Sequence, residues 1–296
     1  MKIYSLLIFI AIYCFSPLKV YAQSIENQIA DFLKEKKTTV GVAVLTDDDK
    51  CIQYNNPIHY PLFSVFKFHV ALAVLDKMDK ENISLDSTLH IKASELHENT
   101  YSPLQKKFPN QDITISLKEL LQYSISLSDN NACDILIGYA GGIQHIHNYI
   151  KQLGISDFNL SETEALMHLS PESAYRNWST PSEVTQLLKI AYEKQLFTQE
   201  YKDFLWQTMI ETSTGANKIK GLLPPNSIVG HKTGSSDRTP QGMKIGDNDA
   251  GVVFLPNGQK YYIAVFVMNS YETDDSNADI IARISKMVYD VMSHND

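Results

Sequence analysis

The chain has 296 residues, of which 44% are hydrophobic and 20% are charged, a balance that is typical of a globular protein and excludes wholesale disorder. Its 26 basic and 34 acidic residues give a formal net charge of -8, and an acidic chain without a basic cluster is a poor candidate for binding nucleic acid. The length exceeds what one hydrophobic core usually serves, so we expect one large domain or two interlocked domains.

The first 22 residues have the pattern of a secretory signal peptide. Lys2 precedes the apolar stretch IYSLLIFIAIYCF, and the stretch VYA ends in the small residue Ala22, after which we expect cleavage. The apolar stretch is shorter than the ~20 residues that a membrane-spanning helix needs. We therefore expect a protein that is exported across the inner membrane, to the periplasm, without a membrane anchor.

The next segment predicts a helix followed by a β-hairpin. Ile25, Ile29 and Phe32 recur at helical spacing, and the β-rich runs TVGVAVLTD and CIQYN follow, separated by a charged turn. Cys51 belongs to the second run, and Cys133 belongs to a helical run further along. One cysteine pair would not make a disulfide framework for a chain of this length, and we expect two buried free thiols.

The middle of the chain, from about residue 62 to about residue 210, has an almost entirely helical pattern. Its amphipathic runs are SLKELLQYSISLS, GIQHIHNYIKQLG, PSEVTQLLKIAYEK and TQEYKDFLWQTMIE. β-rich runs then return as SIVGHKTGSS, DAGVVFLP and KYYIAVFVMN, the last two joined by the turn PNG. The chain closes with the amphipathic helix NADIIARISKMVYDVM.

This order predicts an α/β (α+β) fold in which both ends of the chain complete one antiparallel sheet. Residues 23–61 and 212–296 would form an α/β lobe whose N- and C-terminal helices flank the sheet. Residues 62–211 would form an inserted all-helical lobe. A cleft between the two lobes is the expected position of a functional site.

The stretch SVFK places Ser64 and Lys67 one turn apart at the start of an otherwise apolar helix. In isolation this pattern favours a capping serine and a lysine whose charge reaches solvent. It also suits nucleophilic catalysis, because backbone N–H groups at a helix start can bind an oxyanion. A lysine in low-dielectric surroundings loses proton affinity, so its neutral amine could deprotonate the serine.

Two further motifs allow the same pair of interpretations. The S-D-N motif of residues 128–130 is a good loop and helix cap, but Ser128 could also relay a proton while Asn130 binds a substrate amide. The K-T-G motif of residues 232–234 lies in a β-rich run, where a lysine can protect a sheet edge. Glycine in a strand often marks the close approach of another backbone or of a ligand.

The ordered set S-x-x-K, S-D-N and K-T-G is the signature of class A β-lactamases and penicillin-binding proteins. From about residue 24 to its C-terminus the chain resembles this penicillin-recognising serine family, whose helical lobe and α/β lobe agree with the pattern above. The resemblance implies that Ser64 attacks a β-lactam carbonyl, with the N–H groups of Ser64 and Ser235 as the oxyanion hole. Either Lys67 or a glutamate-held water takes the hydroxyl proton, and Ser128 protonates the departing nitrogen.

The same resemblance implies how a substrate would be held. Its carboxylate would be received by Lys232, Thr233 and Ser235, and its side-chain amide by Asn130.

Hydrolysis also needs a base that activates water, and the loop of residues 161–181 supplies a candidate. Its stretch ETEALMH resembles the class A E-x-x-L-N element, with Glu164 as the general base and His168 in place of the usual asparagine. Glu162 replaces the usual arginine and Asn177 its aspartate partner, so the ion pair that commonly braces this loop is missing. The combination resembles a divergent branch that is often linked to cephalosporin hydrolysis.

Two further positions match the family less specifically. Tyr101 corresponds to an aromatic residue at the rim of the cleft, although a plain surface tyrosine is nearly as plausible. The run DAGVVFLP lacks the arginine usual on this strand, and Lys218 could replace it as a counter-charge for the substrate carboxylate unless it is simply a solvated lysine.

Three other classes of protein stay open as alternatives. A D-alanyl-D-alanine peptidase or penicillin-binding protein shares the nucleophile but needs no Glu164, and a non-hydrolytic β-lactam sensor would be acylated without turnover. A metallo-hydrolase is disfavoured, because His145 and His147 alternate on a predicted helix and do not face each other. We expect no metal and no cofactor, a small-molecule β-lactam as substrate, and a monomer.

Overall fold

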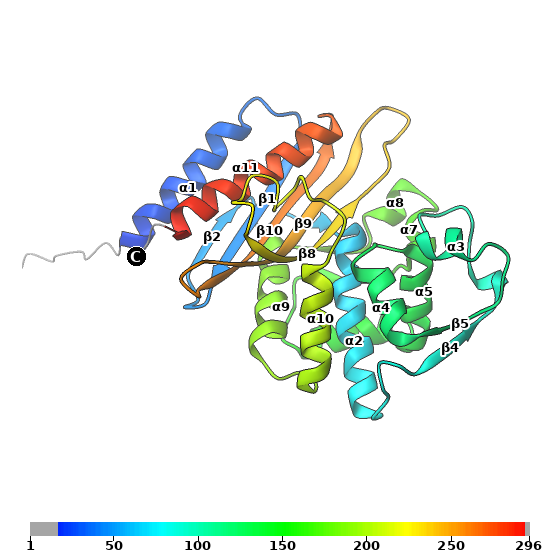
Figure 1. The fold of residues 1–296 in the computed structure, drawn as a ribbon. Coiled ribbons are helices and arrows are strands. Elements are labelled where there is room, and N and C mark those ends of the chain that lie inside the picture. Colours follow the sequence, from blue (N-terminus) through cyan, green and yellow to red (C-terminus); the bar gives the residue numbers. More distant parts are fainter. Residues whose placement is uncertain (1–16, 294–296) are drawn as a thin grey trace, which may run out of the picture.

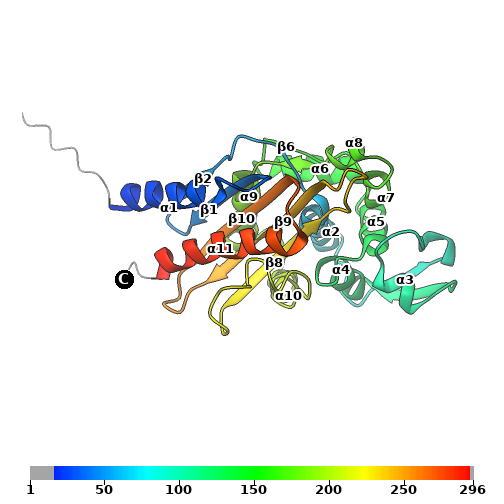
Figure 2. The same ribbon diagram turned by 90° about the horizontal axis from the view of Figure 1, so that it is seen from above.

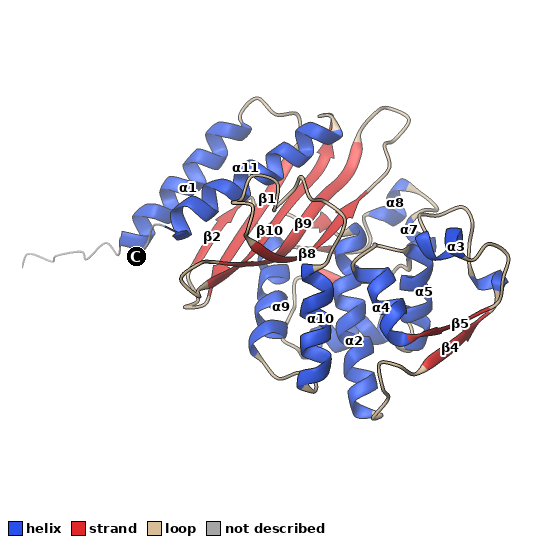
Figure 3. Cartoon of the chain, in the orientation of Figure 1, coloured by secondary structure: helices blue, strands red, loops and turns tan. Residues whose placement is uncertain are grey.

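The computed structural model describes residues 17–293, and a five-stranded sheet is the centre of one half of the molecule (Figure 1; Figure 3 shows its strands in red). The strand order is β2-β1-β10-β9-β8, and every neighbouring pair is antiparallel. The strands are β1 (Thr39–Thr46), β2 (Cys51–Tyr54), β8 (Ile228–Ser235), β9 (Lys244–Phe254) and β10 (Lys260–Ser270). The predicted α+β class, with a sheet completed by both ends of the chain, is confirmed.

Helices cover both faces of this sheet, which explains why β9 and β10 are buried along nearly their whole length. On one face α1 (Pro17–Leu33) and α11 (Asp274–Ser293) lie side by side (Figures 1 and 2). On the other face α9 (Pro181–Glu193) and α10 (Gln199–Ile210) contact the strands. All four helices follow from the apolar spacing of the sequence.

The other half of the molecule surrounds α2 (Phe66–Lys80), whose residues 66–75 are all buried. A helix that is apolar on every side needs neighbours all round, and α2 has them. It packs against three other helices: α4 (Leu117–Ile125), α5 (Asn130–Tyr139) and α6 (Ile143–Gln152). Shorter pieces complete this half: the helices α3 (Pro103–Lys107), α7 (Glu164–Met167) and α8 (Pro171–Ala174), with the 3₁₀ turns η1 (Phe63–Val65) and η2 (Ala93–Glu95).

Short strands interrupt the segment that was expected to be almost entirely helical. β4 (Thr88–Ile91) and β5 (Ile113–Ser116) form a two-stranded sheet. β3 (Tyr60–Pro61), β7 (Trp178–Ser179) and β6 (Phe158–Asn159) form a three-stranded one. Strands of two to four residues are too short to display a period of two, and their partners lie far away in the sequence.

The expectation of two buried thiols is wrong for Cys51, which is exposed, whereas Cys133 is buried; both are free. β2 is an edge strand, and alternation turns Ile52 inward and Cys51 outward. Residues 1–16 of the predicted signal peptide lie outside the described residues, and α1 extends across the predicted cleavage point at Ala22. Within residues 17–293, no helix is both long enough and apolar enough to cross a membrane.

Candidate active site

Ser64 lies in η1, the tight turn that leads into α2, and its side chain is half-buried. The preceding residue, Phe63, has a left-handed backbone with φ of 46°. Strand β8 passes very close to this turn. A Cβ on Gly234 would collide with the carbonyl oxygen of Leu62 and lie 3.1 Å from the nitrogen of Val65. The K-T-G glycine therefore permits the close backbone approach that its position in a strand suggested.

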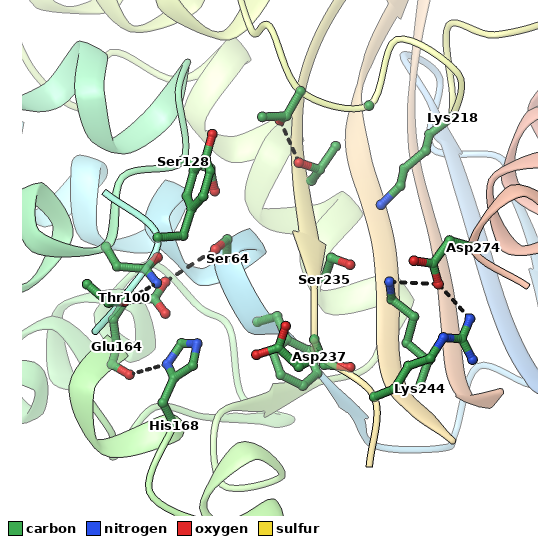
Figure 4. Close-up of a pocket in the computed structure, with 18 of the residues that line it drawn as sticks. Ser64, Thr100, Ser128, Glu164, His168, Lys218, Ser235, Asp237, Lys244 and Asp274 are labelled. Carbon is green, nitrogen blue, oxygen red and sulfur yellow. Dashed lines mark hydrogen bonds and ion pairs between the residues drawn. The ribbon is translucent and has the colours of Figure 1, made fainter. Parts of the chain in front are cut away.

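A cavity of about 870 Å³ opens between this turn, the helical half and the end of β8 (Figure 4). Nine of the predicted site residues line it: Ser64, Tyr101, Ser128, Asn130, Glu164, His168, Lys218, Thr233 and Ser235. Lys67 and Lys232 lie beneath it, at 0% and 1% exposure. Residues that are up to 171 positions apart in the sequence thus meet around one cavity.

The ammonium group of Lys67 contacts three oxygen atoms and reaches no solvent. Its Nζ donates to Ser128 O and to Asn130 Oδ1, both at 2.6 Å, and lies 3.0 Å from Glu164 Oε1. Ser64 Oγ donates to the same Glu164 oxygen at 3.3 Å. One carboxylate oxygen therefore accepts from both the candidate nucleophile and the candidate lysine base, which is an arrangement suited to moving a proton from the hydroxyl.

The second buried lysine belongs to the K-T-G motif. Lys232 Nζ donates to Ser128 Oγ at 2.9 Å and to Thr233 O at 3.0 Å. Burial, and less strongly the positive charge of Lys67, lowers the pKa of Lys232 well below its ordinary value. Ser128 is thus held by two lysines, through its carbonyl by Lys67 and through its hydroxyl by Lys232.

The backbone around Glu164 is held from two sides. Asp134, which the sequence analysis missed, accepts the N–H of Glu164 at 2.7 Å and that of Ala165 at 2.9 Å. Burial, with a smaller contribution from the Glu164 charge, raises the pKa of Asp134 to about 6. On the other side His168 Nδ1 lies 2.7 Å from the carbonyl oxygen of Glu164. These contacts turn the Glu164 side chain inward, where it is 2% exposed.

His168, which stands in place of the usual asparagine, contacts the backbone of Glu164 through its ring (Figure 4). A carbonyl oxygen can only accept, so we assign the ring hydrogen to Nδ1. Nε2 is then an acceptor, on a residue that lines the cavity.

The neck of the 161–181 loop is closed by the side-chain amide of Asn177, which is fully buried. Its Oδ1 accepts from Ser161 N at 2.8 Å and Glu162 N at 2.9 Å, and its Nδ2 donates to Glu162 O at 2.7 Å. Glu162 turns to Arg176 instead, at 3.0 Å. The neutral amide of Asn177 thus braces the loop where the family usually has an ion pair.

Replacing Asn177 with alanine is expected to destabilise the protein by about 2–4 kcal/mol, because two backbone groups of the buried Glu162 lose their partner. Denaturant unfolding measures the change. Glu162→Gln is the matched control: it removes an ion pair whose arginine is 61% exposed, worth less than about 1 kcal/mol. Equal losses of unfolding free energy in the two variants would contradict the proposal that the Asn177 amide holds the two ends of the loop together.

Charged residues that the sequence analysis missed gather at the far end of the cavity, beyond Ser235. Strand β9 begins at Lys244, five residues before the run DAGVVFLP in which a cation was sought. The run DAGVVFLP indeed offers no cation, but the strand to which it belongs does, since Lys244 lines the cavity. The charged and glycine-containing stretch KIGDN hid the start of the strand. Lys218 lies at the same end, with its Nζ 2.5 Å from Asp247 Oδ1.

The other predicted site residues are Asn130, Thr233 and Tyr101. Asn130 Nδ2 donates to Thr100 Oγ1 at 2.8 Å, and the hydroxyls of Thr233 and Thr214 lie 2.7 Å apart. Tyr101 is 53% exposed at the rim. Of the missed residues, Asp134 had a usable signal, because it lies four positions after Asn130 on a predicted helix and so shares its face.

A metal site finds no support in residues 17–293, where no cluster of histidine, cysteine, aspartate and glutamate side chains could hold an ion. The histidine pair considered from the sequence lies on α6, as expected for a helix. His147 instead stacks on Phe158, with ring centroids 4.7 Å apart.

Comparison with known proteins identifies the family to which the chain belongs. The family model described as the beta-lactamase enzyme family matches residues 24–292. A β-lactamase of Bacteroides uniformis is 67% identical over 269 residues, which cover 90% of this chain and 91% of the relative.

Two solved structures are also similar. A class A β-lactamase from Bacteroides cellulosilyticus has 64% identity and a TM-score of 0.91, over 93% of this chain and 99% of that one. The TLA-3 extended-spectrum β-lactamase has 46% identity and a TM-score of 0.91, over 92% and 99%. The chain therefore belongs to the class A β-lactamase family of enzymes that hydrolyse β-lactams.

Proposed function

We propose that this enzyme hydrolyses β-lactams, with a preference for cephalosporins, through an acyl-enzyme on Ser64. The observation that best supports the proposal is the shared contact of Glu164 Oε1 with Ser64 Oγ and Lys67 Nζ. A nucleophile, a cationic group and a carboxylate that meet at one oxygen provide both steps of a covalent hydrolysis: activation of the serine, and later activation of water.

In the acylation step Ser64 attacks the lactam carbonyl, and its proton goes either to Lys67, once that ammonium has given a proton to Glu164, or through a water to Glu164 itself. The N–H groups of Ser64 and Ser235 stabilise the oxyanion. Removing one such donor typically lowers kcat by about 10²–10³-fold. Ser128 then donates its proton to the departing nitrogen, and the proton taken from Ser64 restores the Ser128 hydroxyl. Its contact with the buried ammonium of Lys232 supports this role, because a positive charge near a hydroxyl favours release of the proton.

The substrate is held at both ends of the cavity. Its carboxylate binds Lys232, Thr233 and Ser235, with Lys218 as the further counter-charge. Its side-chain amide binds Asn130, whose amide group then exchanges its present contact with Thr100 for the substrate. Tyr101 packs on the acyl side chain at the rim.

In the deacylation step Glu164 activates water, which attacks the acyl carbonyl on Ser64. His168 lines the cavity beside Glu164, and we propose that its Nε2 accepts a hydrogen bond from the same water. The preference for cephalosporins is supported by the loop closed through Asn177 and by the similarity to a relative named as an extended-spectrum β-lactamase. A penicillin-binding protein would not need an inward carboxylate beside the serine, so the position of Glu164 disfavours that alternative.

Initial rates on one penicillin and two cephalosporins test the substrate class directly. Ser64→Ala is expected to abolish turnover and to remove the covalent mass increase that the unaltered enzyme shows with a slow substrate. A chelator is expected to leave the rates unchanged. A long-lived adduct without turnover would indicate a penicillin-binding protein or a sensor, and turnover by Ser64→Ala would exclude the acyl-enzyme.

We further propose that the enzyme is exported to the periplasm and acts as a monomer, where it confers resistance on the cell. The signal-peptide pattern of the first 22 residues supports the location. Detection of a mature N-terminus at residue 23 in a periplasmic extract tests it.

A further inference from the structure

Beyond Asp237, which also lines the cavity, five further charged side chains gather where the cavity extends past Ser235. Three are cationic, Lys218, Arg238 and Lys244, and all three line the cavity. Figure 4 shows the ammonium groups of Lys218 and Lys244 pointing toward each other, with Asp274 beside them. The fifth residue, Asp247, lies beneath the others and is 3% exposed.

Asp247 joins the two lysines from below. It is paired with Ser235 in the register of β8 and β9, so the two side chains point to the same face of the sheet. Its Oδ1 lies 2.5 Å from Lys218 Nζ, and its Oδ2 lies 3.8 Å from Lys244 Nζ. Lys244 also contacts the exposed Asp274 at 3.1 Å, so Lys218 depends on Asp247 more than Lys244 does.

The backbone that carries Lys218 is already fixed against β8. Gly215 has a φ of 69°, and a Cβ there would collide with Thr233 and lie 3.3 Å from Lys218 Cδ. The Thr214 hydroxyl lies 2.7 Å from that of Thr233. The loop therefore fixes the backbone from which the lysine side chain extends, and the ammonium group at its end is held by Asp247, with a longer contact to the carbonyl oxygen of Asn248 at 3.3 Å.

We propose that Asp247 is a positioning residue for the substrate carboxylate. By binding Lys218 from the buried side, together with the carbonyl oxygen of Asn248 at 3.3 Å, it holds the ammonium group at the face of Thr233 and Ser235 and leaves the third N–H donor to the cavity. The inference rests on the proposed function, in which Lys218 is a counter-charge for that carboxylate.

Charge and position predict opposite results for one substitution. The cluster has three cations and two carboxylates, so Asp247→Asn adds one positive charge. If only the net charge attracted the substrate, this variant would bind an anion more tightly. If Asp247 positions Lys218, the variant binds more weakly despite the added charge. Lys244→Met is the matched control, because it removes a positive charge but leaves the contact between Lys218 and Asp247 in place.

The experiment measures KM and kcat for a chromogenic cephalosporin and for its methyl ester, which lacks the charged carboxylate. Asp247→Asn is expected to raise KM for the free acid about tenfold, since a charge-assisted hydrogen bond becomes misplaced. We expect kcat and the KM of the ester to stay within twofold. Lys244→Met is expected to raise KM for the free acid by less than Asp247→Asn does, because the contact between Lys218 and Asp247 stays in place. A lower KM in Asp247→Asn, or an equal rise for acid and ester, overturns the proposal.

A double-mutant cycle tests whether Asp247 acts through Lys218. Lys218→Met is expected to raise KM for the free acid about as much as Asp247→Asn, and the double variant no further. Additive effects would overturn the proposal. If Asp247→Asn does not fold, an unchanged KM in Lys218→Met still overturns it, and a rise confined to the free acid supports it.

Dissociation constants for the same two ligands, measured by calorimetry in the Ser64→Ala background, separate the two levels of inference. Absence of turnover in the unaltered enzyme would remove the proposed function. The dissociation constant of the free acid would still be compared between proteins with Asp247 and with Asp247→Asn. Equal constants would exclude the positioning role.

Discussion

Glu164→Gln is expected to turn the enzyme into a trap that acylates and then stalls. Glutamine keeps the size of the side chain, but it cannot take a proton from water. General-base catalysis contributes roughly 10²–10⁴ in rate, so we expect deacylation to slow by about 10³. Intact mass spectrometry after mixing with one equivalent of a cephalosporin is expected to show a covalent adduct on nearly all molecules, and peptide mapping is expected to locate it at Ser64.

The rate at which that adduct forms distinguishes the two candidate bases for acylation. Rapid formation in Glu164→Gln would mean that Lys67 suffices, whereas slow formation would mean that Glu164 acts in both steps. Glu162→Gln is the control: it makes the same chemical change two residues earlier, on a side chain that pairs with Arg176 and does not line the cavity. Fast turnover by Glu164→Gln would remove Glu164 from the mechanism.

Gly234→Ala is expected to lower kcat/KM by about 10²-fold, because a displacement of about 1 Å between catalytic groups has that effect. The added methyl group would meet the Leu62 carbonyl oxygen and lie 3.1 Å from Val65 N and 3.2 Å from Phe63 Cβ. Two of these three atoms are backbone atoms of the turn that carries Ser64, so they cannot rotate away. Strand β8 must move, and the K-T-G residues move with it relative to the nucleophile.

Gly138→Ala is the matched control for that substitution. Gly138 lies in the last turn of α5, and a Cβ there would meet no atom within 4 Å apart from its chain neighbours and the backbone of its own helix. Alanine is the better helix former, so this variant is expected to gain about 0.5–1 kcal/mol of stability without a change in rate. Steady-state kinetics and thermal unfolding of both variants provide the comparison. Normal kinetics in Gly234→Ala would show that the close approach has no functional consequence.

Local pattern was enough for the long elements of the fold. The apolar spacing of Ile25 and Ile29 predicted α1, and both side chains are fully buried against the sheet. The β-rich runs at both ends of the chain predicted that both ends complete one antiparallel sheet, and in the structure β1 pairs with β10. Two-residue strands such as Trp178–Ser179 gave no such signal, because their pairing depends on partners brought together by the rest of the fold.

The amino-acid sequence by itself determined which chemical groups the site contains, because the ordered motifs around Ser64, Ser128 and Lys232 carry their own identities and spacing. Only the tertiary structure decided what each group contacts. It brought Asp134 to the backbone of Glu164 and Asp247 to the ammonium of Lys218. The physical reason is that contact energies act at a few ångströms between atoms, whereas these partners are separated by about 30 residues of chain.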